Sequence, residues 1–261
     1  MIQNRQRLLA CVLCTSLGLA QAEPLVVTIM AQESIPPKWV QRDGRIEGVC
    51  PEILTALQKV EPRLRFTGYD NTRSLLMIEA ALESGKALAA CALLDSPRRR
   101  ASSQVIGKPL FIVRHRLAAA AGDNAVINNL DDLARLKPLI NTNRGAAYTA
   151  QLIALGIEVD DSSGDSMVNL KKVLAGHGRF TYMNELSLGW FLQSESLRGK
   201  LRILPAVLKE EPIYFWMSRK AEPEAVRLVG RGLDKLRANG ELARIYERWT
   251  HVKPPIPGSA P

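Results

Sequence analysis

The sequence has 261 residues, of which 46% are hydrophobic and 23% charged, and its formal net charge is +9. This composition excludes a disordered chain and a membrane-embedded one, and the length suits one large domain or two modest ones. The excess of basic residues favours anionic partners but does not indicate the fold.

The first 22 residues have the features of a secretory signal peptide. Arg5 and Arg7 form a positive start, residues 8–19 are apolar, and residues 20–22 read Ala-Gln-Ala, an A-x-A cleavage site. The apolar run is too short to span a bilayer. We therefore expect an exported chain that begins near Glu23 and works in the periplasm.

The four cysteines agree with export. Cys11 and Cys14 lie in the predicted signal peptide, where residues 8–11 faintly resemble a lipoprotein motif, so lipidation is an alternative to simple cleavage. Cys50 and Cys91 are predicted to form a disulfide in an oxidising compartment, and two buried free thiols are the alternative. Two lone cysteines without clustered histidines predict no metal site, and we expect no cofactor.

Predicted strands and helices alternate through the first part of the chain, which also contains a Pro-Pro loop at 36–37 and a turn at Asp43-Gly44. This β-α-β-α-β order predicts a parallel sheet covered by helices. The elements are a strand at 25–30, a helix at 51–60 that opens on a proline, a strand at 64–67, a helix at 75–84 that ends at a glycine, and a strand at 87–94.

A second α/β set follows an extended run at 111–119. A strand-like segment at 213–219 and two amphipathic helices, at 225–237 and 242–249, close the fold, and residues 253–261 are predicted to fray. The pattern predicts two α/β lobes with a cleft between them. The elements of the second set are strands at 138–142, 157–159, 179–183 and 201–206, and helices at 147–155, 166–175 and 185–193.

Six short segments carry motifs that occur together in one family. They resemble, in order, the motifs of family 3 periplasmic solute-binding proteins of the polar amino-acid type, including T-P-E-R, Q-x-G-T-T-Y and L-K-x-x-G-E-L-x-x-I-Y-x-K-W. Each motif is weak alone, but their order covers the chain from residue 25 to 250. The segments are Gly44 to Ile53, Leu82 to Lys86, Ser96 to Arg99, Asn143 to Tyr148, Leu174 to Gly176 and Leu236 to Trp249.

The resemblance implies a type II periplasmic-binding-protein fold, an α/β fold in which each lobe is a mostly parallel sheet flanked by helices. It implies a ligand that sits between the lobes and favours the closed form. Two crossing strands, near 111–116 and 212–214, would act as the hinge. The implied boundaries are residues 23–112 plus 214–256 for lobe 1, 113–213 for lobe 2, and 257–261 for a flexible tail.

The resemblance assigns the ligand's carboxylate to Arg99, in the T-x-x-R position. A guanidinium suits such bidentate binding better than an ammonium. Ser96 is a good N-cap and Pro97 a good first helical residue, so Arg98, Arg99 and Arg100 should occupy the first turn of a short helix. Arg98 and Arg100 are expected to face solvent.

In the other lobe, the loop at Gly145, Ala146 and Tyr148 begins a predicted helix whose free backbone N–H groups suit the same anion. Ala146 stands where the family usually has a hydroxyl residue, so a contact there would use the backbone. Arg144 would add positive charge beside this loop.

One position departs from the family pattern. Asn184 stands where the family usually has an aspartate that pairs with the ammonium of an amino acid, and an amide cannot supply that charge. Asp95, Glu185 or Glu33 would take over this role, or else the ligand has no ammonium. Trp39 follows the Pro-Pro loop, where the family places an aromatic residue against the ligand.

The role of His115 and an enzymatic alternative bear on the predicted function. His115 lies on the predicted first crossing strand, on the face opposite Arg114 and Arg116, and a lone histidine favours a structural role. The predicted function is binding of a small carboxylate-bearing solute, for delivery by a monomer to an ABC permease or a membrane receptor. The enzymatic alternative is a dehydratase similar to cyclohexadienyl dehydratase, with a cleft carboxylate as acid or base and no catalytic residue identified. No nucleic-acid motif is present.

Overall fold

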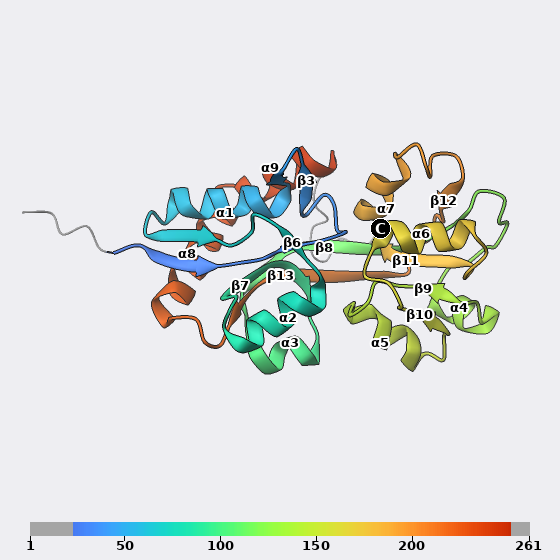
Figure 1. The fold of residues 1–261 in the computed structure, drawn as a ribbon, viewed down its shortest axis with the longest axis horizontal. Helices are drawn as coiled ribbons and strands as arrows, with labels where there is room; N and C mark the ends of the chain where they lie inside the picture. The colour runs from blue at the N-terminus through green and yellow to red at the C-terminus, as the bar shows by residue number, and fades with distance from the viewer. Residues whose placement is uncertain (1–22, 252–261) are drawn as a thin grey trace, which may run out of the picture.

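The structure is a computed structural model that describes residues 23–251, so the predicted signal peptide and the last ten residues lie outside the described part. Two long strands, β8 (Ser103–Ala120) and β13 (Lys209–Ser218), run between two α/β lobes (Figure 1). They pair in antiparallel fashion, from Lys209 opposite His115 to Ser218 opposite Ser103. The chain passes into the second lobe along β8 and returns along β13.

The first lobe combines the N-terminal elements with the two C-terminal helices. Helix α2 begins at the cap Ser74, whose side chain accepts a hydrogen bond from the Met77 backbone N–H, and ends at Gly85 with φ 80°. Its strands are β1 (Leu25–Thr28), β2 (Ala31–Gln32), β3 (Val40–Arg42), β4 (Arg45–Glu47), β5 (Leu64–Thr67), β6 (Thr72–Arg73) and β7 (Ala89–Leu94). Its helices are α1 (Val49–Val60), α2 (Leu75–Ser84), α3 (Pro97–Ser102), α8 (Pro223–Ala238) and α9 (Glu241–Thr250).

The second lobe contains the remaining elements, and α6 and α7 lie on the side of its sheet opposite α4 and α5 (Figure 1). Its strands are β9 (Ile140–Asn141), β10 (Val159–Asp160), β11 (Phe180–Asn184) and β12 (Leu201–Ile203). Its helices are α4 (Leu130–Leu136), α5 (Ala147–Ala154), α6 (Ser166–Leu174) and α7 (Glu185–Leu192).

Apart from the antiparallel hairpin β3–β4, strand pairs within the lobes are parallel, and the pairs formed by the crossing strands are antiparallel. β1 pairs with β5 in parallel, and a parallel bridge from Ile29 to Ala89 links this pair to β7. The larger sheet has the order β10-β9-β11-β8-β13-β7, with β12 on β8. The two-lobed α/β fold that the sequence predicts is therefore confirmed, and its larger sheet is mixed.

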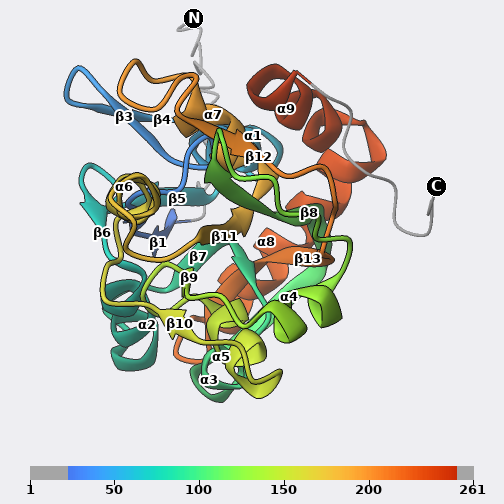
Figure 2. The ribbon, with the colours of Figure 1, turned by 90° about the vertical axis from the view of Figure 1, so that its right-hand side faces the viewer.

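Each lobe buries its own apolar core. The first centres on β1, β7 and α1, and α8 and α9 pack against it although they come last in the sequence (Figure 2). At Gly232 of α8, an added Cβ would lie 2.8 Å from the Leu57 side chain, which explains a glycine inside that helix. The second core is smaller and includes Leu133, Leu152 and Phe180.

Several features differ from the elements predicted from the sequence, among them the short strands β2 and β6. Strand β8 begins at Ser103, eight residues before the predicted run, because Gly107 and Pro109 break the apolar alternation while pairing to β13 continues. Helix α4 was not predicted, since Leu133 is its one buried residue. The hairpin β3–β4 was also not predicted as strands, although its turn is the predicted Asp43-Gly44.

The predicted disulfide is confirmed. Cys50 and Cys91 are bonded, with their Cα atoms 5.9 Å apart, and both are buried. The bond joins the first turn of α1 to the middle of β7 and closes a loop with a sequence separation of 41 residues.

Removing this bond should destabilise the fold. In the chain-entropy model a loop of this length stabilises by roughly 4 kcal/mol. We expect the Cys50→Ala/Cys91→Ala double variant to lose about 2–4 kcal/mol of unfolding free energy, measured by urea denaturation without reductant. The matched control is reduced wild type, which should be nearly as unstable. A double variant as stable as oxidised wild type would contradict the prediction.

Candidate functional site

A cavity of about 190 Å³ lies between the two lobes and takes its walls from both. The first lobe supplies β2, the loop before β3, the start of α2, the end of β7, and α3. The second supplies the loop before α5, the start of α5, and the cap of α7, while β8 and β13 supply the remaining wall. The lining residues are Gln32, Glu33, Ile35, Lys38, Ser74, Leu75, Leu76, Leu93, Leu94, Arg99, Val113, His115, Asn143, Arg144, Ala146, Ala147, Tyr148, Gly164, Asn184 and Ile213.

Direct hydrogen bonds hold the lobes together beside this cavity. Ser34 Oγ donates to Asp165 Oδ1 at 3.0 Å, and Ser166 Oγ donates to the Ser34 carbonyl at 2.7 Å. Ser187 Oγ donates to the Pro36 carbonyl at 2.5 Å. The structure is therefore a closed form, in which the starts of α6 and α7 contact the loop before β3.

Arg99 lines the cavity, and the protein supplies acceptors for two of its guanidinium nitrogens, whereas its buried Nε has no hydrogen-bond partner among the described residues. Its Nη2 donates to Glu79 Oε1 at 2.6 Å and its Nη1 to the Leu94 carbonyl, and the residue is 2% exposed. Ser96 caps α3 as predicted, accepting from the Arg99 backbone N–H at 3.2 Å. A carboxylate from α2 thus already pairs with the predicted clamp.

The loop before α5 contributes Arg144 and Ala146 to the cavity and the start of α5 contributes Tyr148, whereas Gly145 does not line it. Ala146 caps α5 without any side-chain hydrogen bond, so the first N–H groups of the helix are open to a ligand. A Cβ at Gly145 would lie 2.8 Å from the Leu76 side chain of the first lobe, and its φ is 78°. Gly145 therefore allows the close approach of the two lobes.

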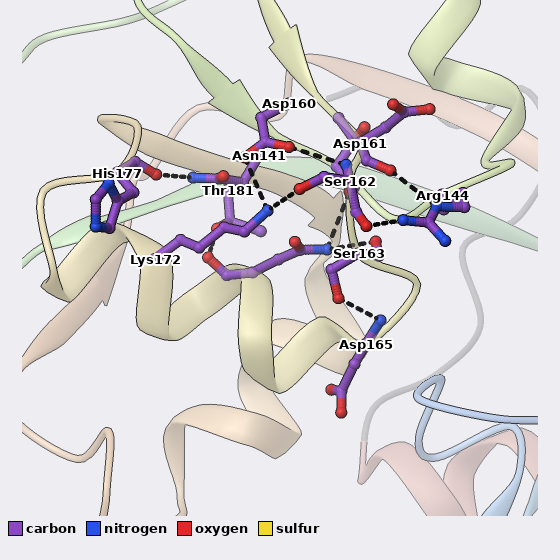
Figure 3. A network of polar contacts seen from close by, with 12 residues as sticks. Asn141, Arg144, Asp160, Asp161, Ser162, Ser163, Asp165, Lys172, His177 and Thr181 are labelled. Atoms are coloured by element: carbon purple, nitrogen blue, oxygen red, sulfur yellow. Dashed lines mark hydrogen bonds and ion pairs between the residues drawn. The ribbon is translucent and has the colours of Figure 1, made fainter.

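Arg144 is held by the chain around it. Figure 3 shows its guanidinium directed at the loop after β10, where it donates to the carbonyls of Asp161 and Ser162. The same loop is fixed by Lys172, which donates to Asp160 Oδ2 at 2.8 Å. The network orients the loop that brings Gly164 to the cavity.

The three carboxylates predicted as partners of a ligand ammonium lie in different places. Asp95 forms an ion pair with Arg100 on the surface, away from the cavity. Glu185 forms one with Arg116 at 2.8 Å and lines a separate groove of about 560 Å³. Glu33 alone among the three lines the cavity, and among the lining residues it is the one carboxylate.

Asn184 lines the cavity as the N-cap of α7. Its Oδ1 accepts from the Ser187 backbone N–H at 2.9 Å, and its Nδ2 donates to Ser187 Oγ at 3.1 Å. Trp39 does not line the cavity. It is 3% exposed in the first core, where its ring lies 6.2 Å from that of Tyr69.

Lys38 also lines the cavity, although no sequence motif predicts it as a site residue. Its Nζ points to β7 and donates to the Ala92 carbonyl at 2.9 Å. Burial and, second, the nearby charge of Arg99 lower the pKa of Lys38 from 10.5 to about 8. No local pattern marks this lysine, because its partner lies 54 residues away.

His115 also lines the cavity, on the alternation face that the sequence predicts. Its ring stacks on Tyr182 with centroids 5.3 Å apart, and its Nδ1 lies 3.3 Å from Glu211 Oε2. Burial lowers the pKa of His115 to about 4, against the opposite effect of Glu211, so the imidazole is neutral at pH 7. His115 is 1% exposed. Its ring contacts Tyr182 on one side and the cavity on the other.

Residues 23–251 have neither a metal-binding cluster nor a membrane-spanning helix. No three His, Cys, Asp or Glu side chains in this range gather closely enough to hold a metal ion. No helix in the same range has the length and apolar character that crossing a membrane requires.

Solved structures with this fold include binding proteins and a sensor. A histidine kinase sensor domain with similarity to periplasmic binding proteins is 17% identical, with a TM-score of 0.76 over 89% of this chain and 99% of that domain. The substrate-binding protein of an amino acid ABC transporter is 14% identical, with a TM-score of 0.71 over 87% and 100%. The GluR0 ligand-binding core from Nostoc punctiforme, in complex with L-glutamate, is 18% identical, with a TM-score of 0.69 over 87% and 99%.

Two lobes, two crossing strands and a cavity between them define a solute-binding fold. The family model for bacterial extracellular solute-binding proteins, family 3, matches residues 26–252, so the chain belongs to this family. A comparison with curated proteins finds no match.

The lowered pKa of Lys38 predicts a specific pH dependence of stability. Because the pKa of Lys38 is about 8 in the folded chain and its ordinary value is 10.5, the unfolded chain binds more protons between these pH values, and stability should rise with pH there. Relative to Lys38→Met, wild type should gain on the order of 3 kcal/mol across this window. Urea unfolding of both proteins near pH 7 and at about pH 10 measures the difference. Parallel pH profiles would show that Lys38 carries no such penalty.

Proposed function

We propose that this protein binds a small carboxylate-bearing solute, with amino acids among the candidates, in the cavity between its lobes. The observation that carries the proposal is the charge of the lining. Lys38, Arg99 and Arg144 are cationic, the start of α5 adds open N–H groups, and Glu33 is the one carboxylate among the lining residues. Such a lining favours an anion over a neutral or cationic solute.

A ligand in this position touches both lobes, so its contacts favour the closed form over an open one. Only the difference between its affinities for the two forms shifts the population. The hydrogen bonds of Ser34 and Ser187 across the lobes add to the same equilibrium. Ligand-dependent closure is the signal that a permease or a receptor would read.

Delivery to an ABC permease or to a membrane receptor, after export to the periplasm, completes the proposal. Membership of an extracellular solute-binding family supports this location. One structural neighbour is a substrate-binding protein of an amino acid ABC transporter and another is a histidine kinase sensor domain, so both forms of delivery have a counterpart in the fold. We propose that the protein acts as a monomer and by binding alone, and that assays for product from prephenate or arogenate find none.

A thermal-shift screen tests the binding proposal. The probes are glycine, L-glutamate, L-glutamine, L-arginine, pyruvate and succinate, and each hit is measured by titration calorimetry. A ligand at 100 times its dissociation constant should stabilise the protein by roughly 2.7 kcal/mol. The proposal fails if none of these probes shifts the unfolding temperature of the wild-type protein.

Substitution of Glu33 tests whether the ligand carries an ammonium group. If an amino acid binds, Glu33→Gln should weaken it about 10- to 100-fold, because a charge-assisted hydrogen bond is lost. Binding of pyruvate and succinate should persist. Asp95→Asn is the matched control, since that carboxylate pairs with Arg100 outside the cavity. Loss of amino-acid binding in the control but not in Glu33→Gln would contradict this assignment.

A further inference from the structure

His115 has a buried imidazole that lines the cavity. Its Nδ1 is enclosed without a hydrogen-bond partner among the described residues, and so is Glu211 Oε2, although only 3.3 Å separates the two atoms. Buried polar atoms are nearly always satisfied, because an unsatisfied one costs free energy. The pair therefore points to a role for His115 and Glu211 beyond packing.

Glu211 determines which ring nitrogen of His115 carries the proton. Its other oxygen, Oε1, forms an ion pair with Lys209 Nζ at 2.9 Å. A carboxylate only accepts hydrogen bonds, so the nitrogen that faces it, Nδ1, is the N–H. The imidazole is neutral at pH 7, because burial lowers the pKa of His115 to about 4. A neutral ring has a single N–H, and Nε2 is therefore an acceptor with a free lone pair.

Neighbouring side chains from three other elements hold the imidazole in this orientation. The ring stacks on Tyr182 of β11, with centroids 5.3 Å apart and 6° between the planes, and lies 5.1 Å from the ring of Tyr148 on α5. Glu211 of β13 lies against Nδ1. With one face and the Nδ1 side of the ring occupied, the edge that carries Nε2 is left to the cavity that His115 lines. Such preorganisation lowers the entropy that binding would otherwise cost.

Open acceptors are scarce among the side chains that line the cavity. The three cationic side chains can only donate hydrogen bonds. The amide oxygen of Asn143 accepts from Asn169 Nδ2 at 3.0 Å, and that of Asn184 accepts from the Ser187 N–H at 2.9 Å. Beside the one carboxylate of the lining, the Nε2 of His115 therefore supplies an acceptor for a ligand N–H or O–H group, and it does so without a charge.

We infer that His115 determines ligand specificity: its Nε2 accepts a hydrogen bond from an ammonium or hydroxyl group of the ligand, and Glu211 is the positioning residue that fixes the tautomer. The inference rests on the proposed function, and it narrows the ligand to carboxylates that also carry a hydrogen-bond donor. The unpaired Nε of Arg99 and the open start of α5 stay available to the carboxylate. A neutral acceptor from β8 thus takes over from the aspartate that Asn184 replaces.

The binding test uses acids that share a carbon skeleton and differ only at the carbon next to the carboxylate. One series is L-alanine, L-lactate and pyruvate, and the other is L-glutamate, L-2-hydroxyglutarate and 2-oxoglutarate. Titration calorimetry should show that wild type binds the hydroxy acid of a series at least about tenfold tighter than the oxo acid, because the oxo group leaves Nε2 without a donor. Lactate and pyruvate carry the same charge, so this ratio does not depend on Glu33.

Three variants locate the source of this preference. His115→Phe keeps a ring against Tyr182 but has no acceptor, and its affinities for the hydroxy and oxo acids should agree within about twofold. Glu211→Gln should reduce the preference, because an amide can also donate to Nδ1 and so permits the other tautomer. Glu210→Gln is the matched control, since that carboxylate pairs with Arg114 on the groove side, and it should keep the preference of wild type. Circular dichroism checks that each variant is folded.

A spectroscopic measurement tests the tautomer without any substitution at the site. Long-range ¹H–¹⁵N correlation spectra at neutral pH distinguish a protonated ring nitrogen from an unprotonated one. The sequence has three histidines, and His177 and His251 are exposed, so the His177→Gln/His251→Gln variant leaves the signals of His115 alone. We expect an Nδ1–H tautomer before ligand is added, and a shift of the Nε2 resonance when an amino or hydroxy acid binds. A merely structural role predicts no such ligand-dependent shift.

The outcomes distinguish this inference from the function on which it rests. The inference is wrong, and the proposed function stands, if any probe binds without a change at Nε2, if the tautomer is Nε2–H, or if oxo acids bind as tightly as hydroxy acids. An equal preference in wild type and His115→Phe has the same meaning. If wild type binds no probe, the proposed function and the inference both fail. An Nδ1–H tautomer, with a preference for donors that His115→Phe loses, supports both.

Discussion

The antiparallel pairing of β8 with β13 is the constraint on which the site depends. Because side chains alternate along a strand, the shared strands present opposite faces to two different spaces. Val113 and His115 line the cavity, whereas Arg114 and Arg116, the residues between and beyond them, line the groove on the other side. A shift of one residue in the β8 register would exchange these sets and place two arginines in the cavity.

The two faces of β8 also differ in how the charges beside them are paired. On the groove side, Glu210 and Glu185 pair with the arginines of β8 at 2.8 Å each, so that face carries its own counter-ions. On the cavity side, the carboxylates of Glu79 and Glu211 lie behind Arg99 and His115 and do not line the space. The cavity keeps an excess of positive charge because its neighbouring acids are used within the protein. This excess of positive charge follows from packing as much as from composition.

Much of this fold was predictable from the sequence, because its signals are local. Ser74 and Gly85 mark the two ends of α2, and the pair Cys50 and Cys91 predicted the cross-link between α1 and β7. The site was less predictable, because its decisive contacts join distant positions. Glu79 lies 20 residues before Arg99 and on another helix, so no spacing rule shows that the family's arginine has an internal partner.

Lys38 illustrates why a site residue can lack any sequence signal and still be strongly constrained. Its position depends on a carbonyl of β7 54 residues away, on the N–H of Cys50, and on the missing side chain at Gly48. None of these three contacts forms a local sequence pattern. Together they hold the ammonium of Lys38 where burial lowers its pKa. An enclosed charge without a counter-ion opposes folding, and the disulfide between the two elements that hold it acts in the opposite direction. The cross-link therefore offsets part of the cost of keeping this charge beside the cavity.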